Sequence, residues 1–389
     1  MKKFLLFLLL FFYGTGKGME GYFYVNADSV NLREEPSIKG KIIEVLKKDT
    51  IVFPQDGIPY NVNLPVIAPG GYTNDFLEGR WIEVIVSNSQ KRGWIFSPYL
   101  GYKFTNITNG FIFETGVNKT NEKRVLLFCI GKMKNGFITD VTTNDSRLLK
   151  KIFKEKKTNS MYLYYLSGKV KTNILVKPKM NIGYNIFEAW PGNEMIEIEA
   201  DLLNKFDMTN FSYKTFLGDF NFGSINIETQ FLSNDNEYKE FIISNNIEHL
   251  KSYVVTNATN ISYVTNETFF VSTIINKKKK IIFSNIVLEY YEYDGVYFDT
   301  EFDTKYSLNA FSIYIAGEKG ELKNIYLDFN SHQGVSGEIE FFYMLTDLNN
   351  DKIPEIWTRV YCYESSYYNV YIFYKDILIK IASIGWTGV

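Results

Sequence analysis

From about Phe104 to the end of the chain, short apolar stretches alternate with turns rich in Asn, Gly, Asp and Lys, as in VLLFCIG, GEIEFFYML and VYIFY. Stretches of this length between such turns are typical of β-strands. Aromatic residues make up 17% of the chain, and they favour pleated, half-buried surfaces. The sequence therefore predicts a mainly β protein with few short helices. Only residues 146–156 and 237–252 have a helical pattern.

The overall charge argues against one class of partner. The formal net charge is −2 over 389 residues, and binding to nucleic acid needs clustered Lys and Arg. The one run of lysines, 277–280, lies between two strand-like stretches and is expected to form a solvated hairpin loop. Nucleic acid is therefore not an expected partner. The length allows two or three domains.

The first residues have the pattern of a signal peptide at 1–16. Lys2 and Lys3 precede an apolar run of nine residues, 4–12, and Gly14 and Gly16 then provide a small-residue cleavage site. A helix of that length is too short to cross a bilayer, and no later stretch is apolar enough to span one once the signal is removed. We therefore expect an exported protein, periplasmic, secreted or on the cell surface.

The cysteines bear on anchoring and on redox state. A lipid anchor would need a Cys directly after the apolar run, but the first Cys is Cys129, so we expect no lipid anchor. The only other Cys is Cys362. A disulfide between the two and a pair of buried thiols are both compatible with the sequence.

The segment after the signal has the pattern of a small barrel of short strands. Val30 and Leu32 alternate with polar neighbours, and Glu35, Pro36 and Ser37 then provide turn chemistry. Further apolar runs follow a charged turn at 47–49 and a polar turn at 88–92. Short strands joined by tight turns are typical of small β-barrels.

Four ordered motifs in this segment resemble the bacterial SH3 (SH3b) domain family over residues 22–101. They are Asn31-Leu32-Arg33 with Pro36-Ser37, Gly79-x-Trp81-x-x-Val84, Gly93-Trp94-Ile95, and Tyr99-Leu100. Residues 55–79 form an insert that is longer than the usual loop of the family. The resemblance implies an SH3-like barrel that binds peptidoglycan or a peptide.

The same resemblance implies four candidate ligand-binding residues: Tyr24, Trp81, Trp94 and Tyr99. Packing in the core is the alternative for Trp81 and Trp94, and it is favoured in so small a barrel.

The remainder of the chain is predicted to be a β-rich region of one or two domains. The predicted domains are 105–235 and 236–389, divided at the polar stretch NDNEYKE.

One candidate metal site lies near the C-terminus. Oxygen ligands at positions 1, 3, 5, 7 and 9 of a short loop can surround Ca²⁺. Asp347, Asn349, Asp351, Glu355 and the backbone carbonyl of Ile353 have this spacing. The pattern resembles the calcium loops of FG-GAP proteins, although Lys352 replaces their usual Gly. A metal-free turn is the equal alternative.

The residue inventory favours binding over catalysis. A cysteine peptidase needs a Cys with a His base, and a zinc amidase needs about three ligands, mostly His. The chain has two histidines, His249 and His332, and neither lies in a catalytic motif. We therefore expect a non-catalytic envelope-binding or scaffold protein that docks on peptidoglycan or on an envelope protein or peptide. The alternatives are a peptidoglycan or glycan hydrolase with a carboxylate pair in 105–389, and a protein–protein adaptor.

Overall fold

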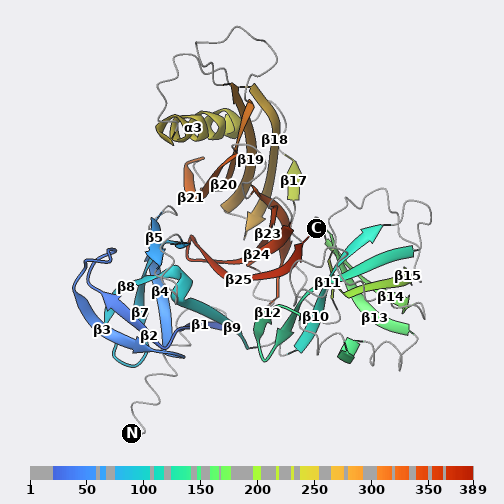
Figure 1. Ribbon diagram of the computed structural model, residues 1–389, viewed down its shortest axis with the longest axis horizontal. Coiled ribbons are helices and arrows are strands. Elements are labelled where there is room, and N and C mark those ends of the chain that lie inside the picture. The colour runs from blue at the N-terminus through green and yellow to red at the C-terminus, as the bar shows by residue number, and fades with distance from the viewer. Residues whose placement is uncertain are drawn as a thin grey trace.

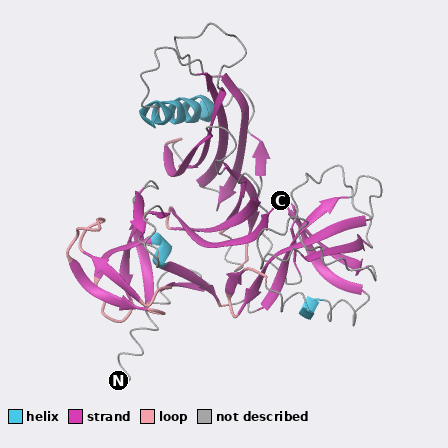
Figure 2. Ribbon diagram, in the orientation of Figure 1, coloured by secondary structure: helices cyan, strands magenta, loops and turns pink. Residues whose placement is uncertain are grey.

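The protein is mainly β, as predicted (Figure 2). The computed structural model describes residues 21–57, 62–66, 75–105, 109–117, 124–141, 147–149, 158–165, 168–176, 196–202, 216–218, 229–231, 237–253, 264–275, 279–291, 305–317, 320–332, 339–348, 353–361 and 365–388. The predicted signal peptide lies outside these residues.

The N-terminal sheet has seven antiparallel strands in the order β3-β2-β8-β7-β4-β1-β9. Their bounds are β1 Gly21–Val25, β2 Ser29–Arg33, β3 Ile42–Lys47, β4 Ile51–Gly57, β7 Trp81–Val86, β8 Arg92–Phe96 and β9 Leu100–Phe104. A 3₁₀ turn, η1 (Ser97–Tyr99), joins the last two. Alternate residues such as Phe23 and Val25 face the core, so the period-2 pattern sets the buried face. Within the predicted insert, β5 (Val62–Val66) and β6 (Asp75–Gly79) form a separate hairpin.

The second sheet has the order β10-β16-β13-β14-β15-β11-β12, and β10 also pairs with β11. The extra pairing joins six of these strands into a closed ring, with β12 beside the end of β11. The bounds are β10 Asn109–Val117, β11 Arg124–Lys134, β12 Phe137–Thr139, β13 Thr158–Tyr165, β14 Gly168–Val176, β15 Ile196–Leu202 and β16 Phe216–Gly218.

The third sheet has five strands in sequence order from β17 to β21, and one helix packs on it (Figure 1). The helix, α3 (Glu237–Tyr253), matches the helix predicted at 237–252. Its Ile242 is fully buried against Ile282, Ile286 and Tyr314 of the sheet. The strand bounds are β17 Thr229–Phe231, β18 Val264–Ile275, β19 Lys279–Tyr291, β20 Lys305–Ala316 and β21 Leu322–His332.

The C-terminal sheet, β22 to β25, lies between the other three (Figure 1). Its strands follow one another in sequence order, as expected for a meander. Their bounds are β22 Ile339–Thr346, β23 Glu355–Tyr361, β24 Ser365–Tyr374 and β25 Ile377–Gly388. β25 contacts β9 of the N-terminal sheet and both β11 and β12 of the second sheet, and β22 contacts β19 and β20 of the third.

One core cluster connects distant parts of the sequence. Phe23 and Tyr102 of the N-terminal sheet, Ile130 of β11, and Trp357 and Ile379 of the C-terminal sheet all belong to it. A second cluster joins the C-terminal sheet to the third sheet through Phe283 and Phe342, whose ring centroids are 4.3 Å apart. The N-terminal and C-terminal sheets therefore share one hydrophobic core. The predicted division near residue 235 stays a prediction.

Two further expectations concern the membrane and the thiols. Among the described residues, no helix has the length and apolar character needed to cross a bilayer. Cys129 is buried in β11, and its thiol donates to the carbonyl of Gly131 at 3.8 Å. Cys362, the other cysteine of the predicted alternatives, lies outside the described residues.

Candidate functional site

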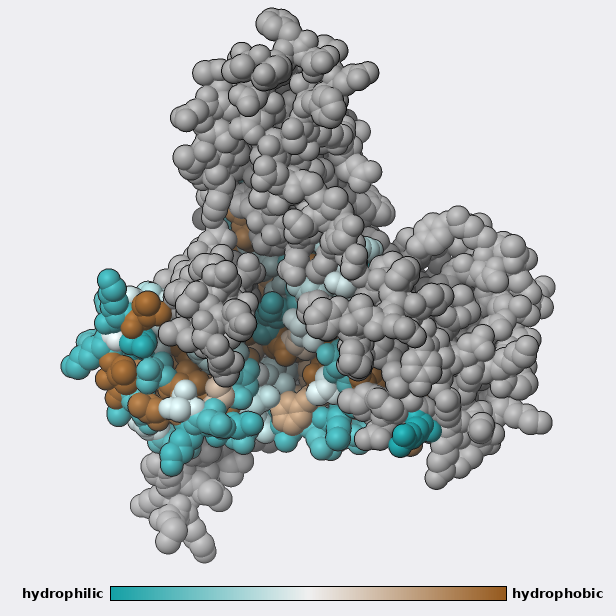
Figure 3. All heavy atoms as spheres, viewed as in Figure 1, coloured by the Kyte–Doolittle hydropathy of each residue, from teal (hydrophilic) through white to brown (hydrophobic). Residues whose placement is uncertain are grey.

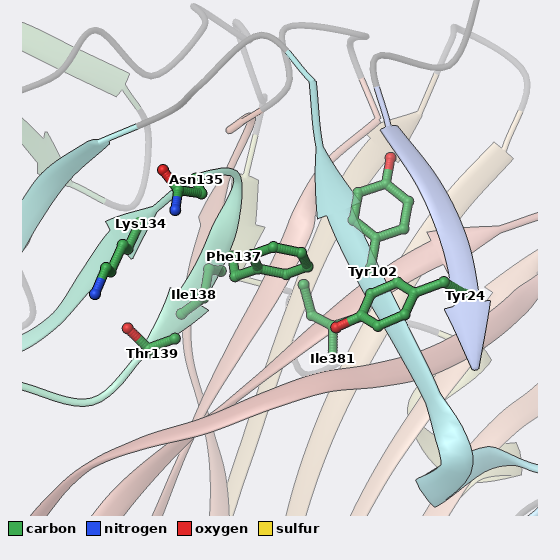
Figure 4. Close-up of a pocket in the computed structure, with 8 residues that line it drawn as sticks. All are labelled: Tyr24, Tyr102, Lys134, Asn135, Phe137, Ile138, Thr139 and Ile381. Atoms are coloured by element: carbon green, nitrogen blue, oxygen red, sulfur yellow. The ribbon is translucent and has the colours of Figure 1, made fainter. Parts of the chain in front are cut away.

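A pocket of about 300 Å³ lies where the N-terminal sheet, the hairpin of β11 and β12, and the C-terminal sheet meet (Figure 4). We call it the seam pocket. Its lining residues come from three separate parts of the chain: Tyr24, Tyr102, Lys134, Asn135, Phe137, Ile138, Thr139 and Ile381. β25 touches both β9 and the hairpin, so it closes the side of the pocket that holds Ile381. The shared core therefore holds the three parts of the wall together.

Tyr24 forms one wall of the seam pocket, and the position of its ring depends on a glycine in the neighbouring strand. Tyr24 on β1 lies directly opposite Gly101 on β9. A Cβ at Gly101 would lie 2.4 Å from the Tyr24 ring, so the ring covers the backbone where a side chain would otherwise stand. Aromatic residues commonly cover a glycine in this way in antiparallel sheets. Because Gly101 has no side chain, one face of the Tyr24 ring lies against the sheet, and the other face is directed toward the pocket.

A two-residue turn positions the opposite wall. Asn135 and Gly136 have φ values of 53° and 85°, which the type I′ hairpin turn requires. A Cβ at Gly136 would lie 2.1 Å from the carbonyl oxygen of Phe104, so only glycine fits. The carbonyl of Gly136 accepts a hydrogen bond from the Phe104 N–H at 2.8 Å. The turn therefore docks on the edge of β9 and places Phe137 opposite Tyr24.

A carboxylate connects the hairpin to the last strand. Asp140, just after β12, accepts a hydrogen bond from the Gly385 N–H at 2.7 Å. Desolvation raises the pKa of Asp140, while the Gly385 N–H and the charge of Lys132 oppose that rise. The bond ties β25 to the hairpin near the pocket wall.

The walls are aromatic, and a lysine lies over one of the wall rings. The ring centroids of Tyr24 and Phe137 are 5.6 Å apart, and the rings meet edge to face. Lys103 Nζ lies 5.3 Å from the centroid of Phe137 and 6.0 Å from that of Tyr22. Such contacts between an ammonium and an aromatic ring are attractive. The lining therefore combines apolar stacking surfaces with nearby positive charge.

The Tyr24 hydroxyl is a polar group on the side of the pocket formed by the N-terminal sheet. Burial raises its pKa, and the charges of Asp49 and Tyr22 add to the rise. The hydroxyl therefore stays protonated in neutral solution and can donate or accept a hydrogen bond. Figure 4 shows it beside Ile381.

The four predicted ligand residues do not gather at one site. Tyr24 lines the seam pocket, whereas Trp81, Trp94 and Tyr99 do not. Trp81 is buried, with its ring 5.6 Å from that of Phe96. Trp94 on β8 and Tyr99 in η1 are both half-buried. The sequence reading missed Phe137, although Asn135-Gly136 between apolar residues is a strong hairpin signal.

The predicted calcium loop is described only at its two ends. Asp347 and Glu355 are both 2% exposed, and Ile353 is half-buried. Glu355 accepts hydrogen bonds from the Leu348 N–H at 2.6 Å and from the Thr346 hydroxyl at 3.3 Å. Asn349 and Asp351 lie outside the described residues. Within the described part of the chain, no three His, Cys, Asp or Glu side chains are grouped to hold a metal ion.

Calcium binding at this loop therefore stays a proposal. If Ca²⁺ binds there, millimolar calcium should raise the melting temperature, because a ligand that binds only the folded state stabilises it. Asp347→Ala should abolish that rise by removing the first ligand of the loop. Thermal unfolding with calcium and with a chelator measures both effects. An unchanged melting curve in calcium would argue for a metal-free turn.

Comparisons with known proteins do not assign the chain to a family. The chain matches no protein-family model, no curated protein and no solved structure. The functional argument therefore depends on the residues and on the site that they form.

Proposed function

We propose that this is an exported, non-catalytic binding protein of the cell envelope whose N-terminal sheet acts as an SH3-like module for peptidoglycan or an envelope peptide. Two kinds of evidence support the proposal. The four motifs between residues 22 and 101 resemble SH3b domains. The signal-like pattern at 1–16 suggests export.

The single observation that carries the proposal is the seam pocket. Binding pockets are concave and mostly apolar, with a few polar groups that orient the ligand. The seam pocket has this character, and its lining includes Tyr24, which the resemblance also implicates. No carboxylate is among the residues that line it, so it lacks the acid and base that glycoside hydrolysis requires. Its composition suits recognition.

Phe137→Ala should weaken binding to purified peptidoglycan sacculi by about tenfold or more. The variant removes one aromatic wall, and losing a stacking ring typically costs about 1–3 kcal/mol. Phe137 is half-buried, so the fold should survive. Co-sedimentation of the mature chain with sacculi measures the effect. Phe241→Ala is the matched control, because Phe241 is 51% exposed on α3 and lies outside the pocket lining.

Trp94→Ala distinguishes two possible binding sites, the seam pocket and the outer surface of the N-terminal sheet. If Phe137→Ala reduces co-sedimentation and Trp94→Ala does not, the seam pocket is the binding site. The reverse result would move the site to the outer surface of the N-terminal sheet. If the wild-type chain does not sediment with sacculi, that result contradicts the proposed function itself.

A protein–protein adaptor is the second candidate function, and the exposed edge of the N-terminal sheet favours it. β3 is an edge strand, and Ile38, Ile42 and Val45 on and before it are 51%, 47% and 54% exposed. Apolar side chains are visible at the surface of this sheet (Figure 3). An unprotected apolar edge can pair with a strand of another chain. Cross-links from β3 to envelope proteins, without sacculus binding, would favour this function.

The hydrolase alternative needs a different result. Among the described carboxylates of the C-terminal sheet, Glu340 and Glu355 are buried and hydrogen-bonded inside the sheet. That environment suits a structural role. Release of soluble muropeptides from sacculi by the purified chain would support a hydrolase, and it would contradict the non-catalytic proposal.

A further inference from the structure

One edge of the N-terminal sheet is open and apolar. β3 is the last strand of its sheet and, among the described strands, pairs with β2 alone. It lies at the outer left of the molecule in Figure 1. Six large apolar side chains are exposed among the described residues, and three of them, Ile38, Ile42 and Val45, belong to β3 and the loop before it. Apolar side chains gathered on an unpaired edge mark a surface that can pair with a strand of another chain.

The charges along this edge are mainly positive. Between residues 39 and 48 the chain has four lysines and one carboxylate. The lysines, all of them exposed, are Lys39, Lys41, Lys47 and Lys48. The carboxylate of Glu44 is engaged by the turn between β7 and β8, where Lys91 Nζ lies 3.6 Å away and the Ser89 hydroxyl donates a hydrogen bond at 2.7 Å. The edge therefore presents positive charge at both ends of an apolar centre.

We propose that β3 binds an extended strand of a partner protein that has apolar side chains in its centre and acidic residues at its ends. The partner's backbone continues the hydrogen bonding of the sheet, and its apolar side chains lie against Ile42 and Val45. Its carboxylates lie near the lysines at the two ends of β3. β3 and β9 are at opposite ends of the sheet, and β3 does not line the seam pocket. The inference therefore goes beyond peptidoglycan binding and names the partner chemistry of the adaptor function.

The lysines favour this partner over a second copy of the chain. In an antiparallel pair of two β3 strands, the lysines at the start of one strand would lie beside the lysines at the end of the other. In a parallel pair in register, each lysine would lie beside the same lysine of the other copy. Like charges on neighbouring strands repel. An acidic strand brings the opposite charge to the same positions.

A bulge limits the length of the paired segment. The register between β2 and β3 pairs Leu32 with Glu44 and Arg33 with Ile42, so Ile43 is an extra residue on β3. A bulge bends the strand and interrupts regular pairing. β3 ends at Lys47. We therefore expect regular pairing from Glu44 to the end of β3, with a partner strand of about the usual length, roughly five to six residues, plus its acidic ends.

Isothermal titration of the mature chain with synthetic peptides tests the inference. The probe is the acetylated and amidated peptide EEVTVTVEE, and the matched peptides have Lys in place of each Glu or Pro in place of the central Val. We expect the acidic peptide to bind at least about tenfold more tightly than either matched peptide, because the basic one repels the lysines and the Pro one cannot pair as a strand. Equal binding of either matched peptide, or no binding of the acidic one, would overturn the inference.

Two variants locate the peptide on β3. Val45→Asp and Lys47→Glu should each weaken binding of the acidic peptide about tenfold or more, because each places a carboxylate on the edge. Both side chains are exposed, so the fold should survive. Lys323→Glu is the matched control, because Lys323 is exposed on β21, the edge strand of the third sheet. An equal loss in Lys323→Glu, or full binding by both β3 variants, would contradict the assignment to β3.

Light scattering without peptide tests the other occupant of the edge. We expect the wild-type chain and Val45→Asp to have the same mass in solution. A wild-type dimer that Val45→Asp dissociates would show that a second copy occupies β3, and it would overturn the inference. Sedimentation with sacculi reports on the proposed function and the peptide titration on this inference, so the two can fail separately.

Discussion

Replacing Trp357 by Ala is expected to lower the free energy of unfolding by about 3–5 kcal/mol, as for other buried Trp residues. Trp357 is fully buried on β23, and its indole N–H donates to the Thr346 hydroxyl at 2.8 Å. Ala would leave a large cavity and remove the donor. The same core cluster contains Phe23 and Tyr102 of the N-terminal sheet. The loss should therefore extend to the N-terminal sheet.

Scanning calorimetry and circular dichroism measure this effect. We predict that the melting temperatures of the N-terminal and C-terminal sheets fall together, by roughly 10 °C. Trp357→Phe is the control, because it keeps a buried aromatic ring and loses the N–H donor and part of the ring volume, at a smaller cost of about 1–2 kcal/mol. If the N-terminal sheet unfolds at an unchanged temperature in Trp357→Ala, the shared core does not couple the two ends.

Replacing Glu340 by Ala is expected to destabilise the protein by a similar amount, about 3–5 kcal/mol. Glu340 is 3% exposed on β22. Its carboxylate accepts hydrogen bonds from four side chains: Tyr326 at 2.5 Å, Tyr371 at 2.8 Å, Asn369 at 3.1 Å, and Thr358. Ala would leave these buried donors without their shared acceptor. A buried donor that loses its acceptor costs its full desolvation penalty.

Glu340→Gln and Glu240→Ala serve as controls for this prediction. Gln keeps the side-chain volume and one acceptor oxygen, so its cost should be smaller, about 1–3 kcal/mol. Glu240 is exposed on α3, so its replacement should change stability by no more than about 0.5 kcal/mol. Chemical denaturation measures all three. A Glu340→Ala protein of normal stability would show that this carboxylate is not a structural group.

The mainly β architecture and the long helix could be predicted from the sequence. Strand-length apolar runs between polar turns predicted strands such as β11 and β19, and the pattern over 237–252 predicted α3. These features depend on local propensity, which a single sequence carries. The closed ring of the second sheet could not be predicted, because it depends on the long-range pairing of β10 with β16 and β11.

The candidate site could be predicted only in part. The resemblance to SH3b domains implies Tyr24 as a ligand residue, but its place in the pocket depends on its register opposite Gly101, which a one-residue shift would change. Phe137 and Ile381 are 244 positions apart in the sequence, and only the packing of β25 brings them together. Glu340 lies in an alternating stretch that reads as an ordinary strand. Its burial depends on the tertiary packing of the C-terminal sheet.

The most direct test of a binding site at the seam pocket is hydrogen exchange of the mature chain with and without soluble peptidoglycan fragments. We predict slower exchange at β1, β9, the hairpin of β11 and β12, and β25, because these elements line the pocket and a bound ligand suppresses local opening. The protection should disappear in Phe137→Ala. Protection confined to the edge strand β3, or no change at any of the four elements, would contradict the account.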